Sequence, residues 1–232
     1  QLASLERLPH VAGVAGREEG EKVRRIVDEV AGFIRRPERC ATFLVIDGWH
    51  HIGTSNAEFE DIAEKVTEIV ADGASAHVHV VIATSRWTTM RPAIRDLIAN
   101  RLELRLGEAL DSLIDRKLQQ KLPSALGRGL TLAGENMLLA RTSNQDIAHI
   151  CRVHAAADPV PQLKMLPAVL TPAALAAQGD VPAREIAWGI GGRDLDTLTW
   201  NPSREPHLVA IGAQGCGCLL YTSDAADERS SV

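Results

Sequence analysis

A glycine-rich stretch near the end of the sequence has the spacing of a phosphate-binding loop. An apolar run, residues 207–211, leads into Gly212, Ala213, Gln214, Gly215, Cys216 and Gly217. The P-loop motif is a glycine, four residues, a second glycine, a lysine, and a serine or threonine; backbone N–H groups of its glycine-rich segment wrap phosphates. Gly212 and Gly217 match this spacing. We therefore predict a buried strand over 207–211 and a phosphate-binding loop over 212–217.

The lysine that the motif requires next, as the cation on the β and γ phosphates, is replaced by Cys218. Residues 218–228 look like the conceptual translation of a transposase-type sequencing adapter. We interpret residues 218–232 as an adapter-derived tail and leave them out of the fold argument. The alternative interpretation is a true degenerate loop followed by a disordered acidic tail.

A second candidate is the acid at the end of the apolar run Phe43-Leu44-Val45-Ile46. Four apolar residues followed by Asp47 form a Walker B pattern, in which a buried strand projects a carboxylate that orients Mg²⁺ through water. We predict Asp47 to be both the catalytic and the metal-associated carboxylate. Many buried strands also end in an acid that only caps the next turn, and that alternative stays open.

The third candidate follows the next apolar run, residues 77–83, where the sequence reads Thr84-Ser85-Arg86-Trp87. Polar groups at such a strand end can sense a γ-phosphate or position an attacking water, and we predict Ser85 for this role. The alternative is that Thr84 and Ser85 only satisfy the backbone of the loop.

Two further sets of side chains carry weaker signals. His77 and His79 would face one side of a strand and could share a metal ion, but zinc sites need three or four ligands, so structural histidines are favoured. One of Arg86, Arg91 and Arg101 could reach the nucleotide of a neighbouring subunit. Ion pairing of these arginines with nearby carboxylates is the commoner outcome.

The predicted elements bring Asp47 and Ser85 to one place. Helical periodicity over residues 18–36 and 56–73 alternates with apolar strand patterns that end at Asp47 and Thr84. A strand, a helix and a strand in this order form a βαβ unit with parallel, buried strands, whose carboxyl ends open on the same edge of the sheet. The candidate carboxylate and hydroxyl should therefore share that edge.

Shorter elements follow. Strict alternation over residues 101–106 predicts a half-exposed strand, and glycines at 127, 129 and 134 predict a hairpin. Ser143 is positioned to cap a helix. Prolines interrupt residues 157–182, which we interpret as a linker between domains, and residues 185–200 resemble a second hairpin that begins a new domain.

Composition restricts the classes of protein. The chain has 232 residues, 25 basic and 30 acidic, a formal charge of −5 and no basic stripe, which argues against a nucleic-acid coat. Four scattered cysteines favour reduced thiols, and no apolar run approaches the length of a membrane span, so the visible piece is expected to be cytosolic. Without an initiator methionine, it is expected to start inside a longer reading frame.

The stretch from residue 43 to 132 resembles the FtsK/SpoIIIE ATPases, and most closely the EccC ATPases of type VII secretion. The resemblance rests on six stretches that occur in register, residues 43–49, 78–87, 91–97, 101–107, 110–112 and 127–130. It implies an α/β, RecA-like P-loop NTPase module, N-terminally truncated, followed by the first strands of a second module. Residues 1–156 would be the C-terminal portion of the first module, 157–182 the linker, and 183–217 the start of the next.

The resemblance also implies cofactors and partners. ATP and Mg²⁺ would be the cofactors, and small helical (WXG-type) secreted proteins and other secretion-machinery subunits the partners. A homo-oligomeric ring at the cytoplasmic face of the cell membrane would be the assembly, with DNA not expected as a partner.

Three departures from the family pattern bear on activity. The module's own P-loop would precede residue 1, so this piece alone is not expected to hydrolyse ATP. Active FtsK-like modules have a glutamate after the Walker B aspartate as base for water, whereas Gly48 follows Asp47 here and cannot accept a proton. Ser85 stands where such modules place a glutamine. We therefore expect ATP binding with weak or no hydrolysis.

Two alternatives stay open. In the first, the module is not catalytic and docks a secreted substrate or a sister module. In the second, the protein is an FtsK-like DNA translocase, against which the acidic charge and the tandem-module order count.

Overall fold

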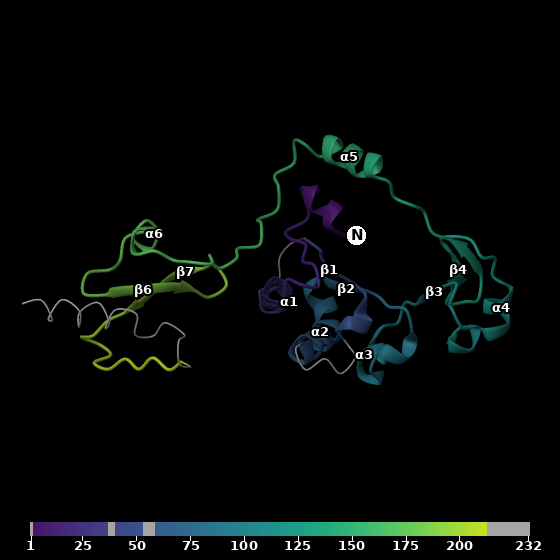
Figure 1. The fold of residues 1–232 in the computed structure, drawn as a ribbon, viewed down its shortest axis with the longest axis horizontal. Helices are drawn as coiled ribbons and strands as arrows, with labels where there is room; N and C mark the ends of the chain where they lie inside the picture. The colour runs from purple at the N-terminus through teal and green to yellow at the C-terminus, as the bar shows by residue number, and fades with distance from the viewer. Residues whose placement is uncertain (1, 37–39, 53–58, 213–232) are drawn as a thin grey trace, which may run out of the picture. The chain divides into compact units, whose positions relative to one another are not determined.

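The computed structural model of the chain describes residues 2–36, 40–52 and 59–212. It divides into two compact units, residues 1–163 and 164–232 (Figure 1). The first unit contains η1 (Leu2–Arg7), α1 (Gly20–Arg35), β1 (Thr42–Asp47), η2 (Trp49–His51), α2 (Glu60–Asp72), η4 (Gly73–Ala76), β2 (Val78–Ala83), η5 (Trp87–Thr89), α3 (Pro92–Leu97), β3 (Leu102–Leu104), η6 (Ala109–Asp111), α4 (Arg116–Lys121), β4 (Arg128–Thr131), β5 (Asn136–Leu138) and α5 (Asn144–Val153).

The centre of the first unit is the predicted βαβ arrangement. β1 and β2 pair in parallel, with Thr42 opposite Val78 and Asp47 opposite Ala83, and α2 connects them. α1 and α2 pack together against the sheet, and the shared core is apolar; its buried members are Val27, Val30, Leu44, Ile46, Trp49, Phe59, Ile62, Ala63, Val66, Ile69, Ala76, Val78, Met90 and Ile94. The sequence prediction of two parallel strands joined by a helix is confirmed.

The prediction that both faces of these strands are buried is wrong for the outer face. Leu44 and Ile46 are buried, but Phe43 is 62% exposed, Val45 52% and Val81 49%. Successive side chains of a strand point to opposite faces, and in the described part of the chain the helices pack on one face only. The apolar run therefore alternates between core and surface instead of lying wholly inside.

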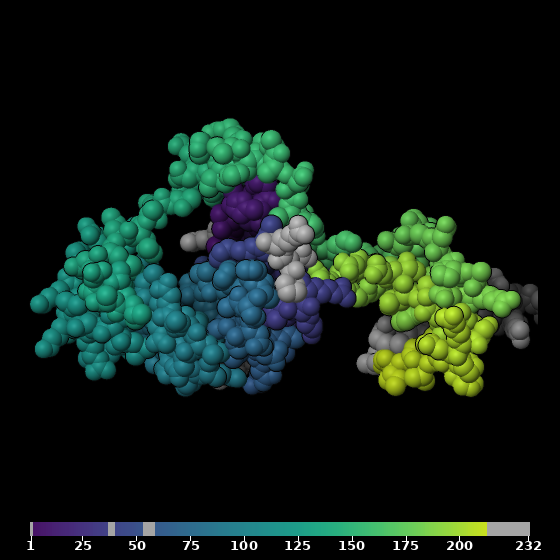
Figure 2. Space-filling model, turned by 180° about the vertical axis from the view of Figure 1, so that it is seen from behind, coloured from purple at the N-terminus to yellow at the C-terminus, as the bar shows by residue number. Residues whose placement is uncertain are grey.

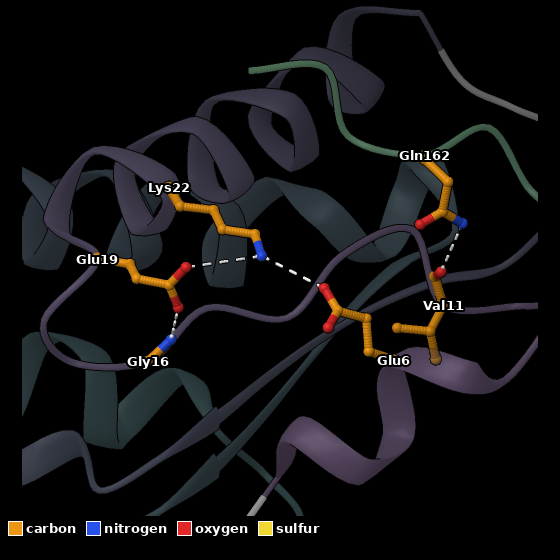
Figure 3. Close-up of polar contacts among 6 residues, drawn as sticks. All are labelled: Glu6, Val11, Gly16, Glu19, Lys22 and Gln162. Atoms are coloured by element: carbon orange, nitrogen blue, oxygen red, sulfur yellow. Dashed lines mark hydrogen bonds and ion pairs between the residues drawn. The ribbon is translucent and has the colours of Figure 1, made fainter. Parts of the chain in front are cut away.

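The segment between η1 and α1 is held by polar contacts (Figure 3). The ammonium group of Lys22, on α1, lies 3.3 Å from a Glu6 carboxylate oxygen and 3.8 Å from one of Glu19. The other Glu19 carboxylate oxygen accepts a 2.7 Å hydrogen bond from the backbone N–H of Gly16. These bonds fix the approach of the chain to α1.

The small antiparallel sheet β3–β4–β5 contains the predicted hairpin of β4 and β5, which is confirmed. β3 shows the predicted alternation, but with its charged residue inside: Glu103 is 2% exposed, whereas Leu102 and Leu104 are 50% and 43% exposed. Burial of a carboxylate requires hydrogen-bond donors around it. These donors come from η5, from the two residues that follow η6, and from α4.

Residues after α5 return to the start of the chain. α5 begins at the capping box predicted from Ser143, whose hydroxyl accepts from the N–H of Asp146. α5 then packs beside η1, green against purple in Figure 2, where the Cys151 thiol donates to the Arg7 carbonyl.

Further along, the N–H groups of Val160 and Leu163 donate to the carbonyls of Pro9 and Ala12 at 2.9 and 2.8 Å. The Gln162 side chain donates to Val11 (Figure 3). Residues 157–163 therefore belong to the first unit.

The second unit contains α6 (Pro172–Ala176) and the antiparallel pair β6 (Ile186–Gly191) and β7 (Asp196–Trp200), which confirms the predicted second hairpin. The predicted strand over 207–211 is wrong. Those residues form no strand, and Ile211 is 91% exposed. A strand needs a neighbour to bond its backbone, and β6 and β7 pair only with each other among the described residues.

Within the described ranges, no helix combines the length and the apolar character that crossing a membrane requires.

Candidate functional site

The carboxyl ends of β1 and β2 form the edge at which the sequence analysis predicts the site residues Asp47 and Ser85. Asp47, the last residue of β1, lies opposite Ala83, the last residue of β2, and Ser85 follows two residues later. Asp47 and Ser85 are both exposed, and neither side chain has a hydrogen bond or ion pair to another described residue. The fold therefore brings the two predicted residues to one edge with their polar groups available to a ligand.

Gly48 shapes this edge because its backbone adopts a left-handed conformation, φ 81° and ψ 45°. Its N–H donates to the Ala83 carbonyl at 3.1 Å, and η2 begins at the next residue. A Cβ at this position would lie 3.2 Å from Cδ2 of His51, closer than most side-chain contacts. Residues with a side chain rarely adopt this conformation, so the turn after Asp47 is adapted to glycine.

Two adjacent histidines follow on η2. The rings of His50 and His51 lie 4.0 Å apart between centroids and are tilted by 43°. Loss of hydration lowers the pKa of His51 below its ordinary 6.5, and the neighbouring charges of His50 and Arg17 lower it further. Both effects favour the neutral form of His51.

The loop after β2 is braced from within. The hydroxyls of Thr84 and Thr89 lie 2.8 Å apart, and the Thr89 hydroxyl donates to the Arg86 carbonyl at 2.7 Å. The alternative that Thr84 and Ser85 only satisfy the loop backbone has a counterpart at Thr84, whose hydroxyl oxygen lies 3.4 Å from the same carbonyl oxygen. Ser85 and Arg86 are presented outward from this loop.

Sequence reasoning missed a buried cluster that anchors the same loop. The Trp87 indole N–H donates to Oε1 of Glu103 at 2.7 Å, and the Leu113 backbone N–H donates to the same oxygen at 2.8 Å. The Ser112 hydroxyl and the Gln119 amide donate to Oε2 at 2.7 and 3.1 Å. Burial alone raises the pKa of Glu103, but these hydrogen bonds outweigh it and hold the pKa below 4.5. The alternation of residues around Glu103 predicted a strand, but it did not indicate that Glu103 is buried among hydrogen-bond donors.

The three arginines considered as trans-acting candidates differ. The Arg101 guanidinium donates to the carbonyls of Ile98 and Arg95 at 2.9 and 2.8 Å, next to the end of α3. Arg91 pairs with Glu60 at 3.3 Å on the surface. Arg86 is exposed, and its guanidinium has no partner among the described residues. Arg101 therefore has a structural role, and only Arg86 is available at the edge.

The remaining predicted site residues lie elsewhere. Gly212 is exposed and outside any strand or helix, and Ala213, Gln214, Gly215, Cys216 and Gly217 lie outside the described residues, as does the interpreted tail 218–232. In the described part of the chain, no cluster of three or more His, Cys, Asp or Glu residues could hold a metal ion, so His77 and His79 form no such site.

The donor set at the edge fits part of a magnesium nucleotide. An exposed carboxylate without a protein partner, Asp47, suits the hydration shell of Mg²⁺, which keeps several waters when bound. The Ser85 hydroxyl and the Arg86 cation suit phosphate oxygens. Bound there, Mg²⁺ would neutralise phosphate charge. Gly48 has no side chain, so the position directly after Asp47 supplies no general base.

A parallel βαβ unit whose strand ends carry an acid and a polar loop is one that P-loop NTPases share with other α/β proteins, and comparison of the sequence with protein families identifies which class applies. The model of the FtsK/SpoIIIE family matches residues 1–146. The chain belongs to the FtsK/SpoIIIE family and has its α/β P-loop fold.

Its relatives are EccC proteins of ESX secretion systems. The chain is 32% identical to the ESX-4 secretion system protein EccC4 of Mycobacterium tuberculosis, over 93% of this chain and 19% of that protein. It is 30% identical to the ESX secretion system protein EccC of Thermomonospora curvata, with the same coverage. It therefore spans about a fifth of the length of these relatives.

Solved structures agree. ATPases 2 and 3 of Thermomonospora curvata EccC, in complex with a signal sequence peptide, match with a TM-score of 0.74 and 29% identity, over 94% of this chain and 46% of that one. ATPases 2 and 3 of EssC from Geobacillus thermodenitrificans match with a TM-score of 0.66 at 14% identity, over 92% of this chain and 48% of that one, which shows the shared fold alone.

Proposed function

We propose that this chain is part of an EccC-type ATPase of type VII secretion, and that its first module binds ATP with Mg²⁺ and hydrolyses it slowly or not at all. Asp47 would hold the hydration shell of the metal, and Ser85 would contact phosphate. Residues 212–217 would cradle phosphates in the next module. The linker predicted over residues 157–182 would connect the two modules from residue 164 on, because residues 157–163 belong to the first unit. The whole protein would form a homo-oligomeric ring at the cytoplasmic face of the membrane, with other secretion subunits and small helical WXG-type substrates as partners.

The observation that carries the proposal of weak turnover is the conformation of Gly48. Hydrolysis requires a group that takes a proton from the attacking water. The residue after the Walker B aspartate would supply it, but here that residue is a glycine at φ 81° with His51 next to its missing Cβ. The turn is thus adapted to glycine, which leaves the position after Asp47 without a base, while the Asp47 carboxylate would still serve for binding.

The test compares variants of a full-length protein that contains this chain. Asp47→Ala should weaken equilibrium binding of a fluorescent ATP analogue in Mg²⁺ about tenfold or more, because a charged interaction contributes about 1.5–3 kcal/mol. Asp158→Ala, an exposed aspartate in the segment after α5, is the matched control and should bind like wild type. Unchanged binding by Asp47→Ala would remove Asp47 from the site.

A second candidate function is substrate docking without catalysis. Gly48 favours it, because a glycine after Asp47 supplies no base for hydrolysis. The Thermomonospora curvata EccC structure that resembles this chain was also solved with a signal sequence peptide. A docking module should bind a secretion-signal peptide equally well with and without ATP, whereas a motor should require nucleotide. The third candidate, a DNA translocase, is disfavoured by the charge of −5, and salt-sensitive DNA binding by the full-length protein would revive it.

A further inference from the structure

We infer that Glu103 is a positioning residue that couples the Ser85–Arg86 loop at the nucleotide edge to the β3–β4–β5 sheet through the indole of Trp87. The inference rests on the proposed function, because that proposal makes the edge at Asp47 and Ser85 a nucleotide site. The link between the loop and the sheet is given by the hydrogen bonds of Glu103.

The Glu103 carboxylate is shared between two pairs of donors. One oxygen of Glu103 accepts from Trp87 and Leu113 at 2.7 and 2.8 Å, and the other from Ser112 and Gln119 at 2.7 and 3.1 Å. Trp87 belongs to η5, Leu113 follows η6, and Gln119 lies on α4. A single buried side chain therefore joins the loop after β2 to three elements of the small sheet region.

Further hydrogen bonds anchor the Glu103 carboxylate to the β3–β4–β5 sheet and the segments beside it. The Gln119 amide N–H₂ also donates to the Leu104 carbonyl at 3.1 Å, and its oxygen accepts from the Leu106 N–H at 3.2 Å. The Ser112 hydroxyl also accepts from the N–H groups of Ile114 and Asp115 at 3.2 and 3.1 Å. Two of the four partners of Glu103, Ser112 and Gln119, are thus fixed by further bonds, and α4 lies beside β4 (Figure 1).

Within the described residues, the loop after β2 makes few other hydrogen bonds to the β3–β4–β5 sheet region. Within the loop, the threonine hydroxyls brace Arg86, and the Met90 N–H donates to the Trp87 carbonyl at 3.0 Å. Among the described residues, the side-chain hydrogen bond that leads from the loop to β3 is the one from Trp87 to Glu103. A shift of Ser85 or Arg86 on contact with a phosphate would therefore reach β3 and the turn at Leu113 through the indole.

The first experiment uses hydrogen–deuterium exchange on the 232-residue chain. Trp87→Phe keeps the ring and removes the N–H donor, so exchange in the peptide 84–91 should accelerate about tenfold. Trp200→Phe is the matched control, because its indole donates to the Glu205 carbonyl at 2.7 Å in the second unit. That variant should leave peptide 84–91 unchanged. Unaltered exchange in peptide 84–91 of Trp87→Phe would overturn the inference.

Variants of Glu103 separate positioning from simple filling of space. Glu103→Gln retains an oxygen that can accept from Trp87 and Leu113, so exchange in peptide 84–91 should stay within about threefold of wild type. Glu103→Ala removes every acceptor and should match or exceed Trp87→Phe. Exchange in Glu103→Gln as fast as in Trp87→Phe would contradict a role through the indole bond. Because Glu103→Ala leaves buried donors unpaired and can fail to fold, Trp87→Phe remains the decisive variant.

The second experiment measures the coupling with a non-hydrolysable ATP analogue and Mg²⁺ in the full-length protein. In wild type, the analogue should slow exchange both in peptide 84–91 and in peptide 111–116, which contains the Leu113 amide bonded to Glu103. In Trp87→Phe, the effect on peptide 111–116 should be lost. An undiminished effect there would overturn the inference. A wild-type protein that binds no nucleotide would refute the proposed function instead, while the first experiment would still decide the role of Glu103.

Discussion

The backbone N–H of Gly48 donates to the carbonyl of Ala83 at 3.1 Å, so the residue after Asp47 is tied to the end of the neighbouring strand. This bond extends the parallel pairing of β1 and β2 one residue beyond Asp47. The left-handed backbone of Gly48 then turns the chain into η2. The position of the Asp47 carboxylate relative to the Ser85 loop therefore depends on a residue without a side chain.

Gly48→Ala is expected to lower the free energy of unfolding by about 1–2 kcal/mol, because a Cβ is strained at a positive φ. Urea denaturation of the 232-residue chain measures this. Gly107→Ala is the control, since Gly107 has no positive φ and an added Cβ there would meet nothing within 4 Å. Equal stability of the two variants would show that the turn tolerates a side chain, and would weaken the argument against a base at position 48.

The two faces of β1 are expected to respond differently to truncation. Leu44→Ala should cost about 2–4 kcal/mol of unfolding free energy, because Leu44 is buried against the helices. Val45→Ala should cost less than about 1 kcal/mol, because Val45 is half-exposed on the other face. Denaturant midpoints of the two variants provide the comparison. Similar losses would mean that the outer face is packed in this chain.

Arginine variants should separate structural from available cations. Arg101→Ala should destabilise the chain by about 1–3 kcal/mol, since two carbonyls near the end of α3 lose a charged donor. Arg91→Ala should cost no more than about 0.5 kcal/mol, because its pair with Glu60 is exposed. Thermal unfolding measures both. A larger loss for Arg91→Ala than for Arg101→Ala would contradict this assignment.

Glu103 makes a defined contribution to stability against acid. Its pKa in the folded chain lies below the ordinary 4.5, so the stabilisation is complete above about pH 4.5 and is lost as the pH falls through the folded value. Unfolding free energies of wild type and Glu103→Gln, measured from pH 6 to pH 3, should therefore converge as the pH falls. A constant difference across that range would show that the carboxylate does not titrate as its hydrogen bonds require.

Local patterns predicted the elements whose hydrogen bonds lie within themselves or with a chain neighbour. α1, α2 and the capping box at Ser143 follow from periodicity and capping chemistry, and the β4–β5 and β6–β7 hairpins follow from glycine spacing. The strand after Pro206 failed because a strand is completed only by a partner, which those residues lack in the described chain.

The sequence by itself determined the order of elements and, through Asp47 and the run that precedes it, the edge at which a ligand would be held. Only the tertiary structure decided which phase of the β3 alternation faces inward, because periodicity gives the spacing of the two faces and not the neighbours of either. Glu103 is buried because donors from three separate elements converge on it, and their convergence is a property of the packed chain.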